Sequence, residues 1–442
     1  MAAFRTRHST SDHSPRALGH VVGALLGATF VLGACTNGDA ADTGETGMEE
    51  SDGTEDGTEG ETEGGENCDV SGAAGDLVWA RTSASTSIEF LAESSTPERG
   101  LMVISRDFND GGGGIPGVQE IGVIGFAADG TEAFDVQLSP DIWPDPFEIV
   151  GGREGSFVVL GIAYEGLSLA KYGGDASTPA WTFLDQSLPG MGEGVESRNG
   201  RLSRGPGGDL AALWDSHIEG PGGIQCAIQF NLIDDETGAA LLDVSLVAGD
   251  GLTVCGYPSG QPTLTVLPDG SYIVVKVNQE AEKYAVWKIG SGGEVVATNV
   301  GDVPSGFSLH TSSAYSKVSN EVLLLWTGLD QTTLLSAIGG DGSLGQTTDI
   351  SAALEGIRGQ AITADPTGNL VVAASDGTVF KLDATSLAQL WRSDAVKSAL
   401  PDHFNIYVGD VVSDGCGDIS VVGSGNSMTS NGFAVRVANP QD

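Results

Sequence analysis

Residues 365–391 read Asp-Pro-Thr-Gly-Asn-Leu-Val-Val-Ala-Ala-Ser-Asp-Gly-Thr-Val-Phe-Lys-Leu-Asp-Ala-Thr-Ser-Leu-Ala-Gln-Leu-Trp. A glycine-containing turn leads into the apolar run Leu370–Ala373, and an Asp-Gly pair follows at 376–377. Short apolar runs between such turns predict β-strands, and the Asp-Gly pair predicts a hairpin. Strong helical periodicity is nearly absent elsewhere; only Ser351–Ile357 and Asp394–Leu400 suggest short helical turns. The sequence therefore predicts an all-β fold.

The unit of turn and apolar strand occurs seven times. Counted from the turn, the units begin at residues 100, 155, 208, 270, 320, 368 and 417, in steps of 55, 53, 62, 50, 48 and 49 residues. The strands are Leu101–Ile104, Phe157–Leu160, Leu210–Leu213, Tyr272–Val275, Val322–Leu325, Leu370–Ala373 and Ile419–Val422. Seven units of roughly fifty residues, each long enough for four strands, predict a seven-bladed β-propeller rather than a two-sheet sandwich.

The two ends of the repeat region complement each other. The last unit ends at Gly432–Val437 with too few residues left for a fourth strand, and Asp76–Arg81 stands alone before the first unit. We expect this N-terminal segment to supply the missing strand. Ring closure of this kind removes an open sheet edge, which would otherwise invite aggregation.

The 27 residues from 365 to 391 resemble the repeat of the quinoprotein-like (PQQ-type) β-propellers, in which a strand, an Asp-Gly hairpin, a Leu-Asp-Ala turn and a closing Leu-Trp recur. Elsewhere only the closing element remains, at Ala180-Trp181 and Leu77–Trp79. The resemblance implies the architecture. The adjacent cysteines, calcium ligands and catalytic aspartate of the quinone-dependent dehydrogenases find no match, so no catalytic residue and no cofactor is carried over.

The N-terminus has the pattern of an export signal. Arg5, Arg7 and Arg16 precede the apolar stretch Ala17–Ala34. Leu32-Gly33-Ala34-Cys35 resembles the lipobox of bacterial lipoproteins, which implies removal of residues 1–34 and lipidation of Cys35. The alternative is an ordinary signal peptide with a chance cysteine. Thr36 rather than Asp after the cysteine favours the outer membrane under the sorting rules of that family.

The segment that follows predicts a tether. Residues 36–67 contain twelve Asp and Glu and no Lys or Arg, so residues 35–67 are expected to form a disordered acidic linker ahead of a propeller domain at 68–442. The whole chain has 20 Lys and Arg against 60 Asp and Glu. Such acidity argues against nucleic acid or anionic lipid headgroups as partners and allows cations or basic proteins.

Four cysteines remain after Cys35, an even number for an oxidising compartment. Cys68 precedes the expected closing strand, and Cys416 lies in the turn that opens the last unit, which predicts a Cys68–Cys416 bond across the seam. Cys226 and Cys255 would then pair within the third unit. Pairing of Cys68 with Cys226 is the alternative that would break the seam model.

Candidate ligand-binding residues are few. Trp214 and Trp326 each fall six residues after the turn of their unit, so they would occupy equivalent places and form an aromatic platform, or else belong to the core. His217, His310 and His403 form no metal-binding pair. Asp107–Gly114 resembles the start of a calcium loop but has Val118 at the twelfth position, so a hairpin loop is favoured and no metal site is predicted.

Two functions fit these features. The first is a binding or scaffold propeller, held to the membrane through its N-terminal lipid, with an unknown protein or glycan partner and no role in nucleic-acid binding. The alternative is a quinone- or metal-dependent enzyme of carbohydrate or alcohol metabolism with its site at the propeller centre. Carboxylates that converge there would favour the enzyme, and an apolar rim on one face would favour the scaffold.

Overall fold

The computed structural model describes residues 68, 72–83, 88–96, 99–107, 120–138, 145–163, 166–174, 176–185, 200–220, 223–246, 262–278, 282–307, 312–328, 330–400, 406–425 and 431–439. These residues belong to one compact unit, Gly65–Asp442. Within them, no helix combines the length and apolar character needed to cross a membrane. Cys35 and the expected linker lie outside the described residues, as do Cys255, His310 and His403.

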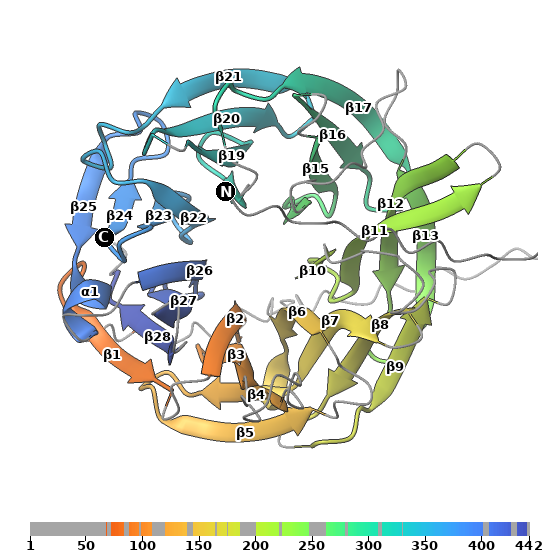
Figure 1. The fold of residues 1–442 in the computed structure, drawn as a ribbon, viewed down its shortest axis with the longest axis horizontal. Helices are drawn as coiled ribbons and strands as arrows, with labels where there is room; N and C mark the ends of the chain where they lie inside the picture. The colour runs from red at the N-terminus through yellow and green to blue at the C-terminus, as the bar shows by residue number, and fades with distance from the viewer. Residues whose placement is uncertain are drawn as a thin grey trace, which may run out of the picture. The chain divides into compact units, whose positions relative to one another are not determined.

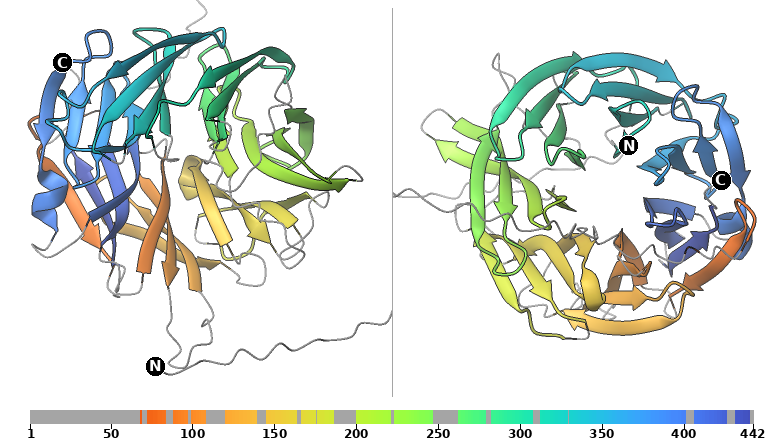
Figure 2. Two further views of the ribbon diagram at one scale, coloured as in Figure 1. Left: turned by 45° about the horizontal axis from the view of Figure 1, so that its top comes forward. Right: turned by 180° about the vertical axis from the view of Figure 1, so that it is seen from behind.

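The compact unit is a ring of seven four-stranded antiparallel sheets (Figures 1 and 2). The innermost strands are β2 (Ile88–Ser95), β6 (Asp145–Gly151), β10 (Gly200–Arg204), β14 (Thr263–Val266), β18 (Ser312–Ser316), β22 (Gly359–Ala364) and β26 (Ile406–Ser413). The second strands are β3 (Leu101–Asp107), β7 (Phe157–Ala163), β11 (Leu210–Gly220), β15 (Tyr272–Asn278), β19 (Glu321–Thr327), β23 (Leu370–Ala374) and β27 (Ile419–Gly425). The predicted seven-bladed β-propeller is confirmed.

Two further strands complete each blade. The third strands are β4 (Glu120–Phe126), β8 (Gly166–Tyr172), β12 (Gly223–Ile233), β16 (Lys283–Ile289), β20 (Thr333–Gly339), β24 (Val379–Leu382) and β28 (Asn431–Val437). The outer strands are β5 (Glu132–Leu138), β9 (Trp181–Asp185), β13 (Ala240–Leu246), β17 (Val295–Asp302), β21 (Leu344–Asp349), β25 (Gln389–Ser393) and β1 (Leu77–Thr82). The described helices are the 3₁₀ turn η1 (Arg153–Gly155) and α1 (Ala395–Ala399), the latter inside the segment expected to be helical.

The strand that repeats in the sequence is the second strand of every blade. The four residues of the repeated run, from Leu101–Ile104 to Ile419–Val422, are buried in all seven copies because the blade is covered on both faces. Among the described residues, the buried apolar side chains form seven clusters, one between each pair of neighbouring blades. The turn before the strand needs glycine in most copies. In the clearest copy, Asp365 N–H donates to Asn369 O at 2.9 Å while Gly368 takes a φ of 90°.

The N-terminal strand closes the ring, as the sequence predicts. β1 pairs antiparallel with β28, with Trp79 opposite Arg436 and Thr82 opposite Phe433, and the last sheet has the order β1-β28-β27-β26. At the centre, β26 contacts β2 of the first blade, so the innermost strands touch one another all the way round. One sheet is therefore built from both ends of the chain.

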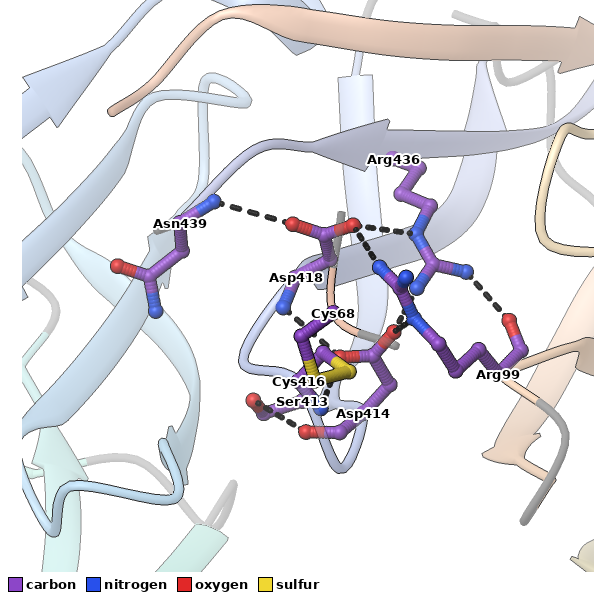
Figure 3. Close-up of a disulfide and its surroundings, with 8 residues drawn as sticks. All are labelled: Cys68, Arg99, Ser413, Asp414, Cys416, Asp418, Arg436 and Asn439. Carbon is purple, nitrogen blue, oxygen red and sulfur yellow. Dashed lines mark hydrogen bonds and ion pairs between the residues drawn. A yellow bond between two sulfur atoms is a disulfide. The ribbon is translucent and has the colours of Figure 1, made fainter. Parts of the chain in front are cut away.

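A disulfide bonds the N-terminal segment to that sheet. Cys68 is joined to Cys416, with 5.4 Å between their Cα atoms, and the predicted pairing is confirmed (Figure 3). Cys416 lies in the turn between β26 and β27. The Cys226–Cys255 pairing stays a prediction because Cys255 lies outside the described residues.

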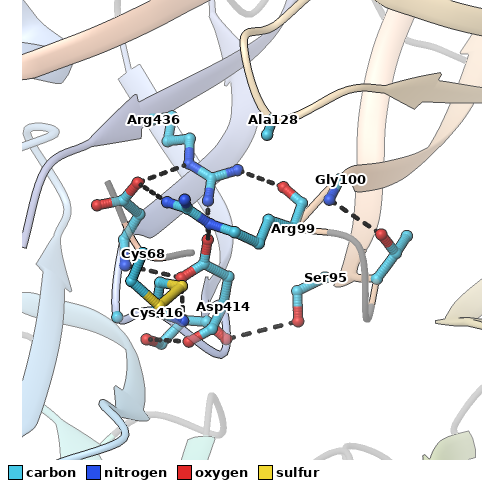
Figure 4. Close-up of polar contacts among 12 residues, drawn as sticks. Cys68, Ser95, Arg99, Gly100, Ala128, Asp414, Cys416 and Arg436 are labelled. Carbon is cyan, nitrogen blue, oxygen red and sulfur yellow. Dashed lines mark hydrogen bonds and ion pairs between the residues drawn. A yellow bond between two sulfur atoms is a disulfide. The ribbon is translucent and has the colours of Figure 1, made fainter. Parts of the chain in front are cut away.

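Buried ion pairs cross the same seam. Arg99, from the turn before β3 in the first blade, donates to Asp414 at 3.1 Å (Figure 4) and to Asp418 at 2.8 Å (Figure 3). Arg436 is only 1% exposed; it donates to Asp414, to Asp418 at 3.3 Å, and to the main-chain oxygen of Arg99 at 2.6 Å. Burial, and then the nearby Arg99, lower the pKa of Arg436 to about 10, so it stays charged at neutral pH. The two arginine and two aspartate side chains together carry no net charge.

We expect the double substitution Cys68→Ser and Cys416→Ser to lower the free energy of unfolding by about 2–5 kcal/mol, because the bond restricts the unfolded chain over a long loop. Urea denaturation of the oxidised wild type and the variant measures this difference. Equal stability of the two proteins would show that strand pairing alone holds the seam.

Candidate functional site

Equivalent positions on the innermost strands define a layer around the central axis. In six blades, one residue of the innermost strand lies opposite the fourth residue of the apolar run that repeats in the sequence, such as Leu160 or Leu325. We call these residues the inner layer: Glu148, Arg201, Thr263, Ser312, Ala361 and Asp410. In the first blade a register shift between Phe90 and Glu93 removes the equivalent pairing. Five of the six side chains are polar, and three of them are charged.

Glu148 and Arg201 form an ion pair between two neighbouring blades. Arg201 Nη1 donates to Glu148 Oε2 at 3.0 Å. Glu148 is 9% exposed, while the Arg201 side chain remains partly open to solvent. Glu148 faces the next blade because Val150, two residues on, packs into the cluster between these blades.

Asp410 joins this pair from the last blade. It interacts electrostatically with both Glu148 and Arg201, and its Oδ1 accepts a bond of 2.8 Å from Val411 N–H. β26 shifts register between Val408 and Asp410, which makes Gly409 the extra residue of a β-bulge. A bulge re-aims the side chain that follows it.

The bulge places Tyr407 and Asp410 on the same face of β26. Val408 and Val411 pack into one cluster, on the side of the sixth blade, although they are an odd number of residues apart. Their neighbours Tyr407 and Asp410 therefore both face the first blade. Tyr407 is 54% exposed, which is unusual for an aromatic residue on an innermost strand. We call Glu148, Arg201, Asp410 and Tyr407 the central cluster.

Arg201 contacts Glu148 and acts on Asp410 only through its charge, and the pKa values of both carboxylates are raised. Burial raises the pKa of Glu148 to about 7; Arg201 opposes the rise and Asp410 adds to it. Burial also raises the pKa of Asp410, with the Val411 N–H and Arg201 opposing. Such a site is poised to take up or release a proton near neutral pH, or to accept a positive charge.

Thr263, another member of the inner layer, has a buried side-chain hydroxyl. Its side chain is 3% exposed, and its Oγ1 has no hydrogen-bond partner among the described residues. Burying a hydroxyl without a hydrogen-bond partner destabilises the folded protein, so packing alone does not explain a threonine at this position.

The two tryptophans predicted as a platform do not belong to this site. Trp214 and Trp326 are buried, each directly after the four-residue run that repeats in the sequence. Trp214 packs near Phe183 at 6.4 Å between ring centroids, and Trp326 Nε1 donates to Ser336 Oγ at 2.8 Å. They are equivalent, as expected, but they fill the cores between blades. The platform hypothesis is wrong for this structure, and the core alternative holds.

The charged members of the central cluster share a fixed position in the sequence repeat, which neither composition nor a known motif reveals. Glu148 precedes Phe157 by nine residues, and the same offset separates Arg201 from Leu210 and Asp410 from Ile419. The residue nine positions before the repeated run is therefore charged in three of the seven units. The offset has meaning only when the strand before the repeat is known to be innermost.

No metal centre is formed by the described residues. They contain no group of three or more His, Cys, Asp and Glu side chains placed to hold an ion. Cys226 on β12 lies opposite His217 on β11 in the strand register, and Cys35 lies outside the described residues.

Comparison with known proteins gives likeness of fold only. No family model matches the chain, and no curated protein matches it. The WD40 β-propeller domain of Doa1 is 11% identical with a TM-score of 0.44, and the match covers 83% of this chain and 97% of that one. The C-terminal WD40 domain of Sif2 is 12% identical with a TM-score of 0.44, over 83% and 98%. A luciferin-regenerating enzyme is 12% identical with a TM-score of 0.43, over 68% and 92%.

We expect Glu148→Gln to change how stability depends on pH. Between about pH 4.5 and 7, Glu148 is protonated in the folded protein but ionised in the unfolded chain, so wild-type stability falls as pH rises. The variant has no ionisable group at this position, so its stability does not fall in this way as the pH rises. Its free energy of unfolding relative to wild type should improve by roughly 2–3 kcal/mol from pH 5 to pH 8.

Urea denaturation at both pH values measures the effect. The matched control is Glu132→Gln on the exposed outer strand β5, which removes the same charge. An identical pH response in the two variants would contradict a raised pKa at Glu148.

Proposed function

We propose that the protein is a binding propeller of the bacterial cell envelope, anchored by lipid at Cys35 and extended from the outer membrane by residues 35–67. Its ligand is recognised at the central cluster. One observation carries this proposal: three charged residues from three blades and an exposed Tyr407 gather around the central axis. A rigid ring with variable inner positions suits recognition.

The energetics support binding rather than a purely structural role. The folded protein raises the pKa of both carboxylates, which means that it would be more stable at neutral pH without their charges. Groups that are retained at such a cost are more often functional than structural. Burial also raises the pKa of Asp418 and lowers that of Arg436 at the seam between the first and last blades, but there the two cations match the two carboxylates in number.

A second candidate function is an enzyme with its site at the central cluster. The pKa of Glu148, at about 7, suits a general acid or base, and converging carboxylates are what the enzyme hypothesis requires. Among the described residues, no three or more His, Cys, Asp and Glu side chains are grouped to hold an ion. Dye-linked turnover of alcohols or sugars, with quinone and Ca²⁺ added, would favour the enzyme if Glu148→Gln abolished it.

The anchor is tested by Cys35→Ala. We expect the variant to leave the membrane fraction and to lose incorporation of labelled palmitate, because the thiol carries the diacylglycerol. Cell fractionation and labelling measure both. Retention of the variant in membranes would count against lipid anchoring, and a Thr36→Ala variant, which keeps the Cys35 thiol, is the control.

The site is tested by photocrosslinking in intact cells. We expect a photoreactive phenylalanine at Tyr407 to give a discrete adduct that Asp410→Asn removes, because both side chains lie on one face of β26. The control places the same group at Leu241, which is exposed on the outer strand β13. An equal adduct from both positions would show that contact is not confined to the central cluster.

A further inference from the structure

We propose that the central cluster binds its ligand through a protonated amine. This inference rests on the proposed binding function and specifies its chemistry. The shared chemistry is an alkylammonium group, supplied either by a free amine or by a lysine side chain.

The net charge of the central cluster favours a cationic ligand. Arg201 is held by Glu148 at 3.0 Å, so its guanidinium is already engaged. Asp410 accepts a main-chain bond from Val411, whereas an ionised carboxylate can accept about four hydrogen bonds. When both carboxylates are ionised, one more positive charge would balance them, whereas an anion would meet repulsion from both.

Tyr407 provides the aromatic half of a cation site. It shares a face with Asp410, and the residues opposite the two, Ser424 and Val422, are two apart on β27. Two residues along a strand span roughly 7 Å, a distance that an alkylammonium with its methylene chain can bridge. An ammonium against an aromatic face gains attraction from the ring quadrupole, and the methylenes gain apolar contact.

The surroundings favour an amine over a metal ion. The described residues contain no group of three metal-binding side chains, and Arg201 lies against one of the two carboxylates. In the same layer, the Thr263 hydroxyl has no hydrogen-bond partner among the residues that the structure describes and can accept an N–H. The excess of 60 acidic over 20 basic residues would also concentrate cations near the protein.

Titration calorimetry with 1,5-diaminopentane tests the proposal on the full chain in detergent. We expect saturable binding of one molecule and no binding of pentane-1,5-diol, which has the same length without charge. Asp410→Asn should weaken binding by about tenfold or more, which corresponds to about 1.4 kcal/mol. Asp135→Asn, an exposed position on β5 that removes the same charge, should change affinity less than twofold.

A blocked Gly-Lys-Gly peptide and its Nε-acetylated form make the second arm, which separates a lysine side chain from a free amine as the source. Tyr407→Leu gives a variant whose exposed position does not threaten folding, and it should weaken binding threefold to tenfold. Equal losses in Asp410→Asn and Asp135→Asn would overturn the proposal, as would binding of the diol. If no amine binds while the Tyr407 adduct persists, the ligand chemistry is wrong and the binding site stands.

Discussion

The pairing of β1 with β28 is the constraint on which the rest of the structure depends. It joins residues from the two ends of the chain in one sheet and leaves no blade incomplete. The disulfide between Cys68 and Cys416 and the buried pairs of Arg99 and Arg436 reinforce the same seam. Asp410 lies on the innermost strand of that sheet, so the central cluster exists only when the ring is shut.

The fold could be predicted from the sequence because it depends on spacing. Seven apolar strands at steps near fifty residues, with one strand missing at the end and one spare at the start, define a closed ring. The central cluster could not be predicted in the same way. Its members are ordinary surface residue types, and only the strand register brings Glu148, Arg201 and Asp410 to equivalent positions. The same limit applies to Trp214 and Trp326. A strand that is covered on both faces is apolar at every position, so its sequence does not reveal which face an indole side chain occupies.

The two groups of buried charge show how one fold uses ionic groups differently. At the seam, two arginines face two aspartates and the arrangement is neutral. Around the axis, two carboxylates face one arginine, and burial holds their protons more tightly. A balanced network specifies which strands pair, whereas an unbalanced one leaves interaction energy available to a ligand.

The position of β1 also has a consequence for biogenesis. Synthesis runs from the N-terminus, so Leu77 leaves the ribosome 360 residues before its partner Val437. The first strand must therefore wait, unpaired, until the other six blades and the remainder of its own have emerged. Contacts this distant along the chain form slowly, since loop closure precedes any gain from pairing. A truncated or stalled chain would expose an unmatched edge on its final sheet, which is a recognisable mark for quality control by chaperones and proteases.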